Sequence, residues 1–343
     1  TQPNKVDEAV TMADQSRPTI RDVAARAGVS YQTVSRVINS SGGVRPATQA
    51  RVEAAIAELG FRANAIAQFM ATGSTHTLTC LSPNLTDYTF ACIIEGAEQE
   101  ARQHGYYLFS ASAPDESTFD RLIDQMITSR RTEGLMVINP YADDRFTLLP
   151  HAVPTVFVGA RPREESVDSV ALDDVGAGRL ATQHLLARGH QRIGVICGPA
   201  MEDCTQDRLE GYQAALTEAG IPCDNALVME GDWSATSGYR ALTRLLELDS
   251  PPTAIFAQND RMAVGVLRAA RDRGLDIPQD LAVIGVDDMP LASYFDPPLT
   301  TLRQDLYAIG RQAAQLVIQA IEQPDAPRQH LLLPAELVVR QST

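Results

Sequence analysis

The sequence predicts a small all-α domain at the N-terminus, followed by a larger α/β domain with two lobes. Residues 19–59 contain short segments with apolar side chains at helical spacing and no strand-like run. From residue 75 onward, short apolar runs alternate with helical stretches, as in parallel sheets covered by helices on both faces. The length of this second region, 75–343, favours two sheets over one.

The segment 19–39 is typical of two short helices joined by a tight turn. Thr19 is expected to cap the first helix, Gly28 to make the turn and Ser30 to cap the second helix. Glutamine and arginine match the edges of adenine and guanine, and hydroxyl side chains suit phosphates. We therefore predict a DNA-binding face, with a merely solvated face as the alternative. Its outward side chains are Tyr31, Gln32, Ser35, Arg36 and Asn39.

The charge distribution supports the DNA-binding interpretation. The whole chain carries a formal net charge of −14, which by itself argues against a nucleic-acid partner. Residues 17–73, however, contain seven arginines and no lysine against three acidic residues, a net charge of +4. The remainder carries −18. This asymmetry favours docking through the basic domain, because the acidic remainder repels phosphates.

Residues 75–343 supply the strands and helices of the α/β domain. Helical stretches are predicted between most of the apolar runs, at 91–104, 178–187, 208–219, 238–246 and 262–273. Ligands of such folds bind at the carboxyl ends of the strands, so a site between the two lobes is expected. The apolar runs are 78–81, 106–109, 135–138, 156–158, 193–196, 254–256, 283–286 and 299–302.

Polar and aromatic side chains that follow these runs are the candidate ligand contacts. An aromatic face with arginine, asparagine and aspartate suits a polyhydroxylated ligand, because the face stacks on C–H groups and the polar groups pair with hydroxyls. Each of three candidates also has an alternative, purely structural role: a surface ion pair for Arg208, a core position for Trp233 and a helix cap for Asn259. The candidates are Asp87, Tyr88, Phe90, Arg208, Trp233, Asn259, Asp287 and Gln304. Arg208 and Gln304 are each expected to begin a helix.

The segment 19–39 strongly resembles the helix-turn-helix of the lactose-repressor (LacI/GalR) family, with a lactose-repressor-like recognition helix at Tyr31-Gln32-Thr33. The resemblance extends to about Arg340 and implies a body like that of a periplasmic sugar-binding protein. It implies that Tyr31, Gln32 and Arg36 read bases. Thr19, Ser30, Thr33, Ser35 and Asn39 would position the DNA backbone.

The same resemblance places a hinge helix at residues 64–74, although a plain linker is the alternative because so short a helix needs packing to persist. In the family this helix folds on DNA and wedges an apolar side chain into the minor groove. Asn64, Ala67 and Met70 are the corresponding candidates. The implied domains are a disordered leader at 1–16, a headpiece at 17–63, a hinge at 64–74 and an effector domain at 75–343.

The resemblance also implies effector contacts at Arg208, Asn259 and Asp287, and a sugar-stacking role for Trp233. Arg161 and Arg261 depart from the family's side chains and are candidate contacts for an anionic group. We expect a cytoplasmic homodimer that binds pseudo-palindromic double-stranded operator DNA and is controlled allosterically by a small sugar or glycoside. A sugar-binding receptor without DNA activity is the runner-up.

Other function classes find little support. The first sixteen residues lack the apolar core of a signal peptide, and no apolar run is long enough to span a membrane. Five scattered cysteines predict reduced thiols. His184 and His190 lack the accompanying ligands of a metal site, and we expect neither metal nor cofactor. An enzyme using Asp287-Asp288 or Asp173-Asp174 is disfavoured, because adjacent strand residues point to opposite faces.

Overall fold

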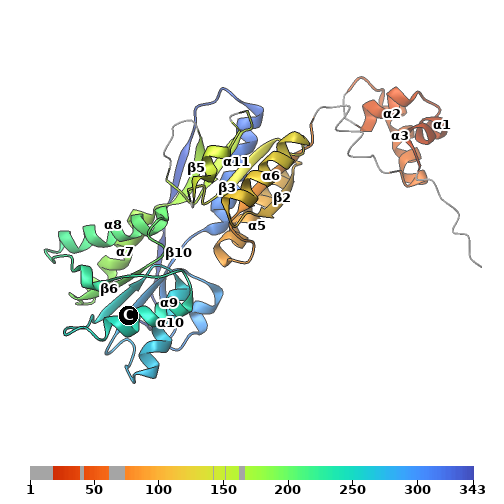
Figure 1. Cartoon of the computed structure of the whole chain (residues 1–343). Coiled ribbons are helices and arrows are strands. Elements are labelled where there is room, and N and C mark those ends of the chain that lie inside the picture. Colours follow the sequence, from red (N-terminus) through yellow and green to blue (C-terminus); the bar gives the residue numbers. More distant parts are fainter. Residues whose placement is uncertain (1–17, 39–41, 62–73, 142, 151, 162–166) are drawn as a thin grey trace, which may run out of the picture. The chain divides into compact units, whose positions relative to one another are not determined.

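The computed structural model describes residues 18–38, 42–61, 74–141, 143–150, 152–161 and 167–343. The chain divides into two compact units, Thr1–Thr75 and His76–Thr343, which we call the headpiece and the body (Figure 1). The predicted leader at 1–16 lies outside the described residues, as do Asn39 and the hinge candidates Asn64, Ala67 and Met70. The boundaries proposed for the leader, hinge and effector domain therefore remain predictions.

The described residues of the headpiece form three helices, α1 (Ile20–Ala27), α2 (Tyr31–Ile38) and α3 (Pro46–Leu59). Thr19 begins α1 with a capping box, since its hydroxyl accepts from the Asp22 N–H and the Asp22 carboxylate accepts from the Thr19 N–H. Gly28, at φ 64°, ends the helix in the left-handed conformation that glycine adopts without strain. The small core consists of Val23, Ala24, Ala27, Val34, Val52 and Ala55.

The body contains two six-stranded sheets, each in its own lobe. Lobe 1 has the order β11-β5-β4-β3-β1-β2 and is entirely parallel. Its strands are β1 (Thr77–Ser82), β2 (Tyr107–Ser112), β3 (Gly134–Ile138), β4 (Thr155–Val158), β5 (Asp168–Leu172) and β11 (His330–Leu333).

Lobe 2 has the order β12-β10-β9-β8-β6-β7, in which only the edge pair of β12 with β10 is antiparallel. Its strands are β6 (Ile193–Cys197), β7 (Val228–Glu230), β8 (Ala254–Ala257), β9 (Ala282–Asp287), β10 (Thr300–Arg303) and β12 (Glu336–Val338). The confirmed fold class is thus a helical headpiece joined to a two-lobed α/β body.

Helices cover both faces of each sheet, which explains why every residue of the central strands β3, β6 and β8 is buried. In lobe 1, α5 (Tyr88–Gln103) and α11 (Leu306–Glu322) cover one face, and α6 (Glu116–Thr128) with the 3-10 helix η1 (Asp144–Leu148) covers the other. In lobe 2, α7 (Asp174–Ala187) and α8 (Asp203–Glu218) lie opposite α9 (Ala235–Leu245) and α10 (Asp260–Asp272). Two more 3-10 helices, η2 (Asn225–Leu227) and η3 (Pro290–Tyr294), complete lobe 2.

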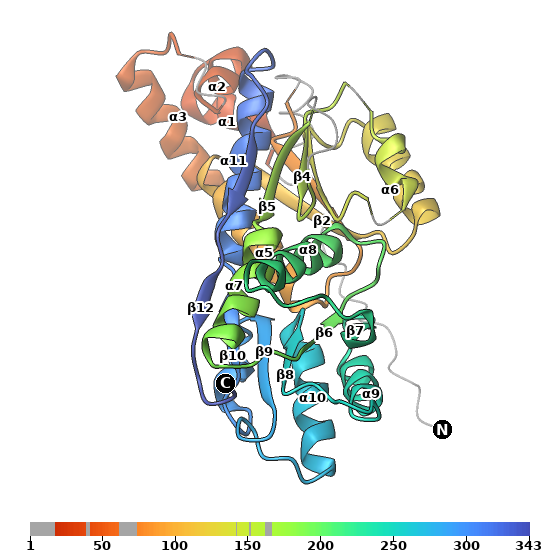
Figure 2. The same ribbon diagram turned by 90° about the vertical axis from the view of Figure 1, so that its left-hand side faces the viewer.

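The chain passes between the lobes three times, from β5 to α7, from β10 to α11 and from β11 to β12. Figure 2 shows the last passage as the dark blue segment that runs from lobe 1 down to β12 in lobe 2. Each lobe is therefore assembled from segments that are distant in sequence. No helix in the described part of the chain has the length and apolar character needed to cross a membrane.

Two sequence predictions about helix starts are wrong, one by five residues and the other by two. Arg208 was expected to open a helix, but α8 begins at Asp203, so Arg208 lies inside it. Gln304 was expected to begin a helix, but Asp305 caps α11 and the helix begins at Leu306. In both cases acidic residues at the true start provide the favourable interaction with the helix N-terminus.

Candidate functional site

The exposed side of α2 carries the residues expected to contact DNA. Ser30 caps this helix, because its hydroxyl accepts from the Thr33 N–H at 3.2 Å. Tyr31, Gln32 and Arg36 are exposed, and Tyr31 leaves 56% of its surface open to solvent. Val34 faces the opposite way and is fully buried in the headpiece core. Helix α2 thus presents hydrogen-bonding and cationic side chains on one face, as a helix in a major groove requires.

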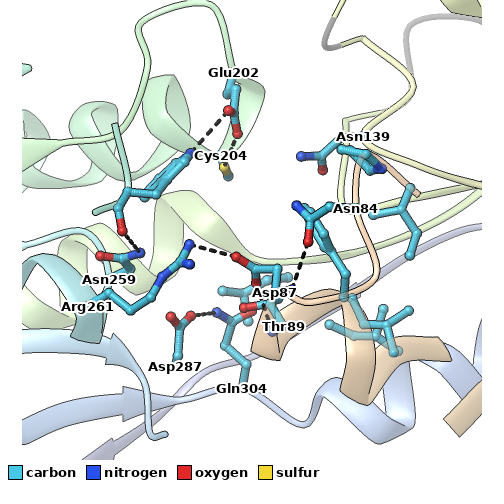
Figure 3. A pocket seen from close by; sticks show the side chains of 18 of the residues that line it. Asn84, Asp87, Thr89, Asn139, Glu202, Cys204, Asn259, Arg261, Asp287 and Gln304 are labelled. Carbon is cyan, nitrogen blue, oxygen red and sulfur yellow. Dashed lines mark hydrogen bonds and ion pairs between the residues drawn. The ribbon is translucent and has the colours of Figure 1, made fainter. Parts of the chain in front are cut away.

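A cavity of about 370 Å³ lies between the two lobes of the body (Figure 3). Its lining comes from loops and helices that follow the carboxyl ends of strands in both sheets, which is where ligands bind in open α/β folds. Lobe 1 contributes Asn84, Asp87, Thr89, Phe90 and Asn139, whereas lobe 2 contributes Asp174, Glu202, Arg208, Asp232, Trp233, Asn259, Arg261 and Asp287; Gln304 lies where the chain returns to lobe 1.

Arg208 is held rigidly at the cavity wall. Its Nε donates to Asp174 Oδ1 at 2.7 Å, and the two side chains are only 7% and 8% exposed. A second nitrogen donates to the backbone carbonyl of Gln258. Burial raises the pKa of Asp174, and the guanidinium opposes that shift by stabilising the carboxylate. The surface ion pair considered for Arg208 is therefore wrong, because both partners are buried.

Trp233 sits in a strained backbone position between β7 and α9, with φ 65°. Its indole N–H donates to Glu202 Oε1 at 3.1 Å, and its carbonyl accepts from Asn259 Nδ2 at 3.2 Å. The ring packs directly on Gly198, where a Cβ would lie 2.0 Å from a ring carbon. Glycine at this position is thus required for the observed ring placement. The Arg208 guanidinium lies 6.0 Å from the ring centroid.

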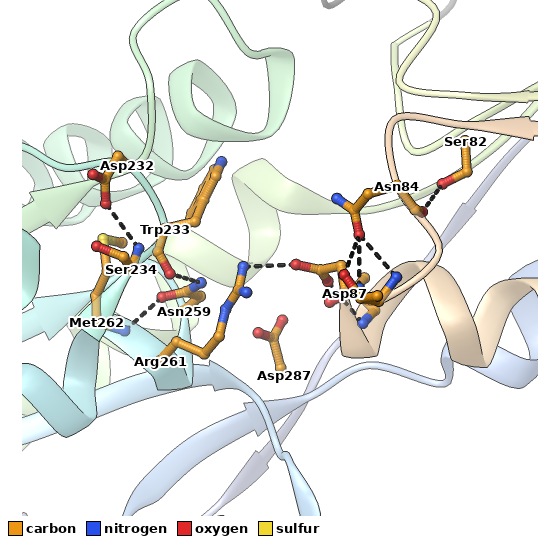
Figure 4. Close-up of polar contacts among 12 residues, drawn as sticks. Ser82, Asn84, Asp87, Asp232, Trp233, Ser234, Asn259, Arg261, Met262 and Asp287 are labelled. Atoms are coloured by element: carbon orange, nitrogen blue, oxygen red, sulfur yellow. Dashed lines mark hydrogen bonds and ion pairs between the residues drawn. The ribbon is translucent and has the colours of Figure 1, made fainter. Parts of the chain in front are cut away.

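Asn259 both caps a helix and lines the cavity. Its Oδ1 accepts from the Met262 N–H at 2.8 Å, which fixes the start of α10. Its Nδ2 donates to the Trp233 carbonyl, as described above, and so ties the α10 cap to the tryptophan loop (Figure 4). The capping and site interpretations of Asn259 are therefore compatible, and the cap makes its position rigid.

Asp287 forms the floor of the cavity at the end of β9. Gln304 Nε2 donates to its Oδ1 at 2.7 Å. Burial raises the pKa of Asp287 to about 7, although Arg208 opposes the shift. Asp260 lies close behind it and accepts from the Thr301 hydroxyl at 2.6 Å. Burial, and then the neighbouring Asp287, raise the pKa of Asp260 well above its ordinary value.

Asp87 and Arg261 join the two lobes across the cavity. Arg261, from the first turn of α10, places a guanidinium nitrogen 2.6 Å from Asp87 Oδ2 (Figure 4). The other Asp87 oxygen accepts from the Thr89 N–H at 2.9 Å and caps α5. Asn84 Oδ1 in turn accepts from the Asp87 N–H at 2.7 Å. Asp87 is therefore held in place by the Asn84 side chain and by the first turn of α5.

The structure brings together eight of the ten predicted effector contacts and leaves two outside the cavity lining. Tyr88 packs partly buried against the core of lobe 1. Arg161 lies beside α8, where its guanidinium is 3.1 Å from Asp207 Oδ1. Sequence reasoning missed Asn84, Asn139, Asp174 and Glu202, all of which follow strands and line the cavity. The strand-end rule that identified Asp87 also covers Asn84 and Asn139. Asp174 follows β5, which was not among the predicted apolar runs, and Glu202 lies five residues past the end of β6.

The remaining alternatives from the sequence have structural explanations. His184 Nε2 and His190 Nδ1 contact the hydroxyls of Thr343 and Thr253 at 2.8 and 3.0 Å. Asp173 caps α7, and Asp288 accepts from Arg303 and Arg340. Within the described residues, no cluster of three potential ligands could hold a metal ion. Of the five cysteine thiols, Cys80, Cys92 and Cys197 are buried and none forms a disulfide.

Known proteins match both units. Residues 19–64 match bacterial regulatory proteins of the lacI family, and residues 182–343 match the periplasmic binding protein-like domain. The ribose operon repressor of Escherichia coli strain K12 is 36% identical over 328 residues, which cover 94% of this chain and 99% of that protein.

Solved structures agree with this match. The lac repressor dimer bound to operator and the anti-inducer ONPF is 31% identical, with a TM-score of 0.86 and coverage of 95% of this chain and 99% of that one. The complex of the transcriptional regulator CelR with cellobiose is 34% identical, with a TM-score of 0.75 and coverage of 95% and 100%. The chain belongs to the lacI family of bacterial regulatory proteins.

Proposed function

We propose that this protein is a sequence-specific DNA-binding repressor whose affinity for its operator is controlled by a small sugar or glycoside bound between the two lobes. The single observation that carries the proposal is the combination, in one chain, of an exposed α2 face with a polar cavity containing Trp233. The first supplies DNA contacts and the second supplies an effector site. Coupling between them is reciprocal, because effector and operator share one free energy of interaction.

The side chains that line the cavity support a sugar as its ligand. Trp233 offers a flat apolar face, and the surrounding amides and carboxylates supply acceptors and donors for neighbouring hydroxyls. A volume of about 370 Å³ falls within the range of small-molecule sites. Related proteins point the same way, since CelR was solved with cellobiose.

A homodimer on a pseudo-palindromic operator is part of the proposal, because two headpieces must hold two half-sites. An exposed apolar strip supports self-association: Tyr107 and Phe109, on the edge strand β2, leave 76% and 47% of their surfaces open. We assign the protein no enzymatic role, because Asp173 and Asp288 are committed to a helix cap and to two arginines.

The test begins with operator selection from a random palindromic DNA library, followed by anisotropy titration with and without a panel of sugars. We expect Arg36→Ala to weaken operator binding by about 1–3 kcal/mol, or roughly 5- to 150-fold. The matched control is Arg121→Ala, which removes an exposed arginine from α6 in the body. Equal losses in both variants would contradict the assignment of α2 to DNA.

The runner-up, a sugar-binding receptor without DNA activity, makes a different prediction for removal of residues 1–73. Under both proposals the shortened protein should retain a thermal shift with sugar, because the cavity lies wholly in the body. Only the repressor proposal requires operator binding in the full chain and its loss in the shortened one. Failure to select any DNA site with the full chain would favour the receptor.

A further inference from the structure

The cavity contains an ion pair that spans the two lobes. Arg261 belongs to lobe 2 and Asp87 to lobe 1, and their closest atoms are 2.6 Å apart. Both residues line the cavity, so the pair lies where an effector would bridge the lobes. The Asp87 side chain is 14% exposed, whereas that of Arg261 is 43% exposed. An effector that enters must accommodate this pair or break it.

The two partners differ in how firmly they are held. Asp87 is fixed through its backbone N–H, which donates to Asn84, and through its carboxylate, which caps α5. Arg261 reaches Asp87 with a long side chain whose remaining surface is half open. Removing the arginine would therefore leave the carboxylate in place, while removing the carboxylate charge would free a cation inside the cavity.

Charge balance around the cavity gives the pair its significance. Arg208, the other arginine in the lining, is matched by Asp174 at 2.7 Å. With both arginines matched, Glu202 and Asp232 remain as further acidic side chains of the lining. A phosphate or carboxylate on the ligand would meet this acidic surface and could gain a cation only by displacing a protein carboxylate.

We propose that the Asp87–Arg261 pair is a specificity determinant that admits uncharged polyhydroxylated ligands and excludes phosphorylated and acidic sugars. This inference rests on the proposed effector function and names its ligand class more narrowly. Hydroxyls can donate to Asp87 and accept from Arg261 without separating the pair. An anionic sugar would compete with Asp87 for the guanidinium. The earlier expectation that Arg161 and Arg261 serve an anion is thereby replaced, since each already faces a carboxylate.

The test measures thermal shifts of the full chain with matched ligand pairs. The probes are ribose with ribose 5-phosphate, glucose with glucose 6-phosphate and glucuronate, and cellobiose with cellobionate. We expect at least one uncharged sugar to raise Tm by about 5 °C at about 100 times its Kd, because it binds only the folded chain. Its anionic counterpart should leave Tm unchanged.

Variants that change the charge of the Asp87–Arg261 pair should change the preference of the protein for uncharged over anionic sugars. Asp87→Asn frees Arg261 and should let the anionic counterpart of the responding sugar raise Tm. The double variant with Arg261→Gln should lose this gain. Asp115→Asn is the matched control, because Asp115 also caps a helix with its carboxylate but lies outside the cavity lining. It should keep the wild-type preference.

The outcomes separate the two levels of the proposal. The specificity role of the Asp87–Arg261 pair is overturned if an anionic sugar raises the Tm of the wild-type protein. It is also overturned if Asp87→Asn keeps the wild-type preference for uncharged sugars. Neither result contradicts the effector function. If no uncharged sugar in the panel changes Tm or operator affinity, the proposal that the effector is a sugar is overturned, and the specificity role of the ion pair is overturned with it. Operator binding by each variant, measured without sugar, shows whether the DNA-binding function survives independently.

Discussion

The two lobes use a buried arginine for different purposes. Among the described residues, Arg145 in lobe 1 and Arg208 in lobe 2 are the buried arginines. Arg145 donates to both oxygens of Asp143 and to the Ala113 carbonyl, and thereby fixes a loop outside the cavity lining. Arg208 makes a similar set of bonds but lies against Trp233 in the cavity. The comparison shows that burial and pairing of a charge do not by themselves identify a binding residue; location does.

The largest expected effect distinguishes these two arginines. Arg145→Met and Arg208→Met should each lower the free energy of unfolding by about 3–5 kcal/mol, because each leaves a carboxylate without its partner in a poorly solvated site. Asp143 is 30% exposed, so its variant should lie at the lower end. Denaturant titration measures both. Only Arg208→Met should also lose the sugar-induced thermal shift.

The next effect concerns the aromatic face that lobe 2 supplies. Trp233→Ala should weaken sugar binding by about 2 kcal/mol, roughly 30-fold, because an aromatic contact at the centre of a site contributes disproportionately. Trp233→Phe keeps a ring but loses the bond to Glu202, so it should retain most of the affinity. Calorimetric titration with the sugar found in the screen gives both values. Equal affinities for wild type and Trp233→Ala would exclude stacking.

A third prediction concerns Asp287 in lobe 2 and the pH dependence of the free energy of unfolding. The folded protein holds a proton on Asp287 up to about pH 7, whereas the unfolded chain releases it near the ordinary value of 3.8. Stability from this group should therefore fall as pH rises between these values, by up to about 1.4 kcal/mol per pH unit, and level off above pH 7. Asp287→Asn should gain stability relative to wild type from pH 5 to 7. A pH-independent difference would contradict the shift.

The smallest effect is expected where the lobes meet outside the cavity lining. Arg161 reaches Asp207 across the lobes, but its side chain is 45% exposed. Arg161→Met should therefore change the free energy of unfolding by about 0–1 kcal/mol. Burial raises the pKa of Asp207 to about 6, so this variant should be compared with wild type at pH 8. A loss above 2 kcal/mol would mean that this contact holds the lobes together.

The parts that sequence predicted well are those governed by local patterns. Strands β3, β6 and β8 carry uninterrupted apolar residues because both of their faces are buried, and they were located to within a few residues. Thr19 and Gly28 marked the ends of α1 through cap chemistry. Asp87, Trp233 and Asn259 were identified because they follow strands.

The parts that sequence missed depend on contacts between distant residues. Asp174 was considered as half of a catalytic pair, and nothing local indicates that it binds Arg208, 34 residues further on. The interlobe partners Asp87 and Arg261 are separated by 174 positions. Glu202 has no distinctive neighbours, and only the folded structure places it under the indole N–H.

The three passages between the lobes also bear on the order of assembly during translation. The elements of lobe 2 from α7 to β10 emerge as one continuous stretch. Lobe 1, by contrast, needs α11, whose Leu306, Ile309 and Val317 complete the core beneath β1 and β3. Its core therefore closes only after the ribosome has made lobe 2. A nascent chain stopped before residue 306 would lack α11 and with it Ile309, which belongs to this core and also lines the cavity, so the ligand site is among the last parts of the molecule to be completed.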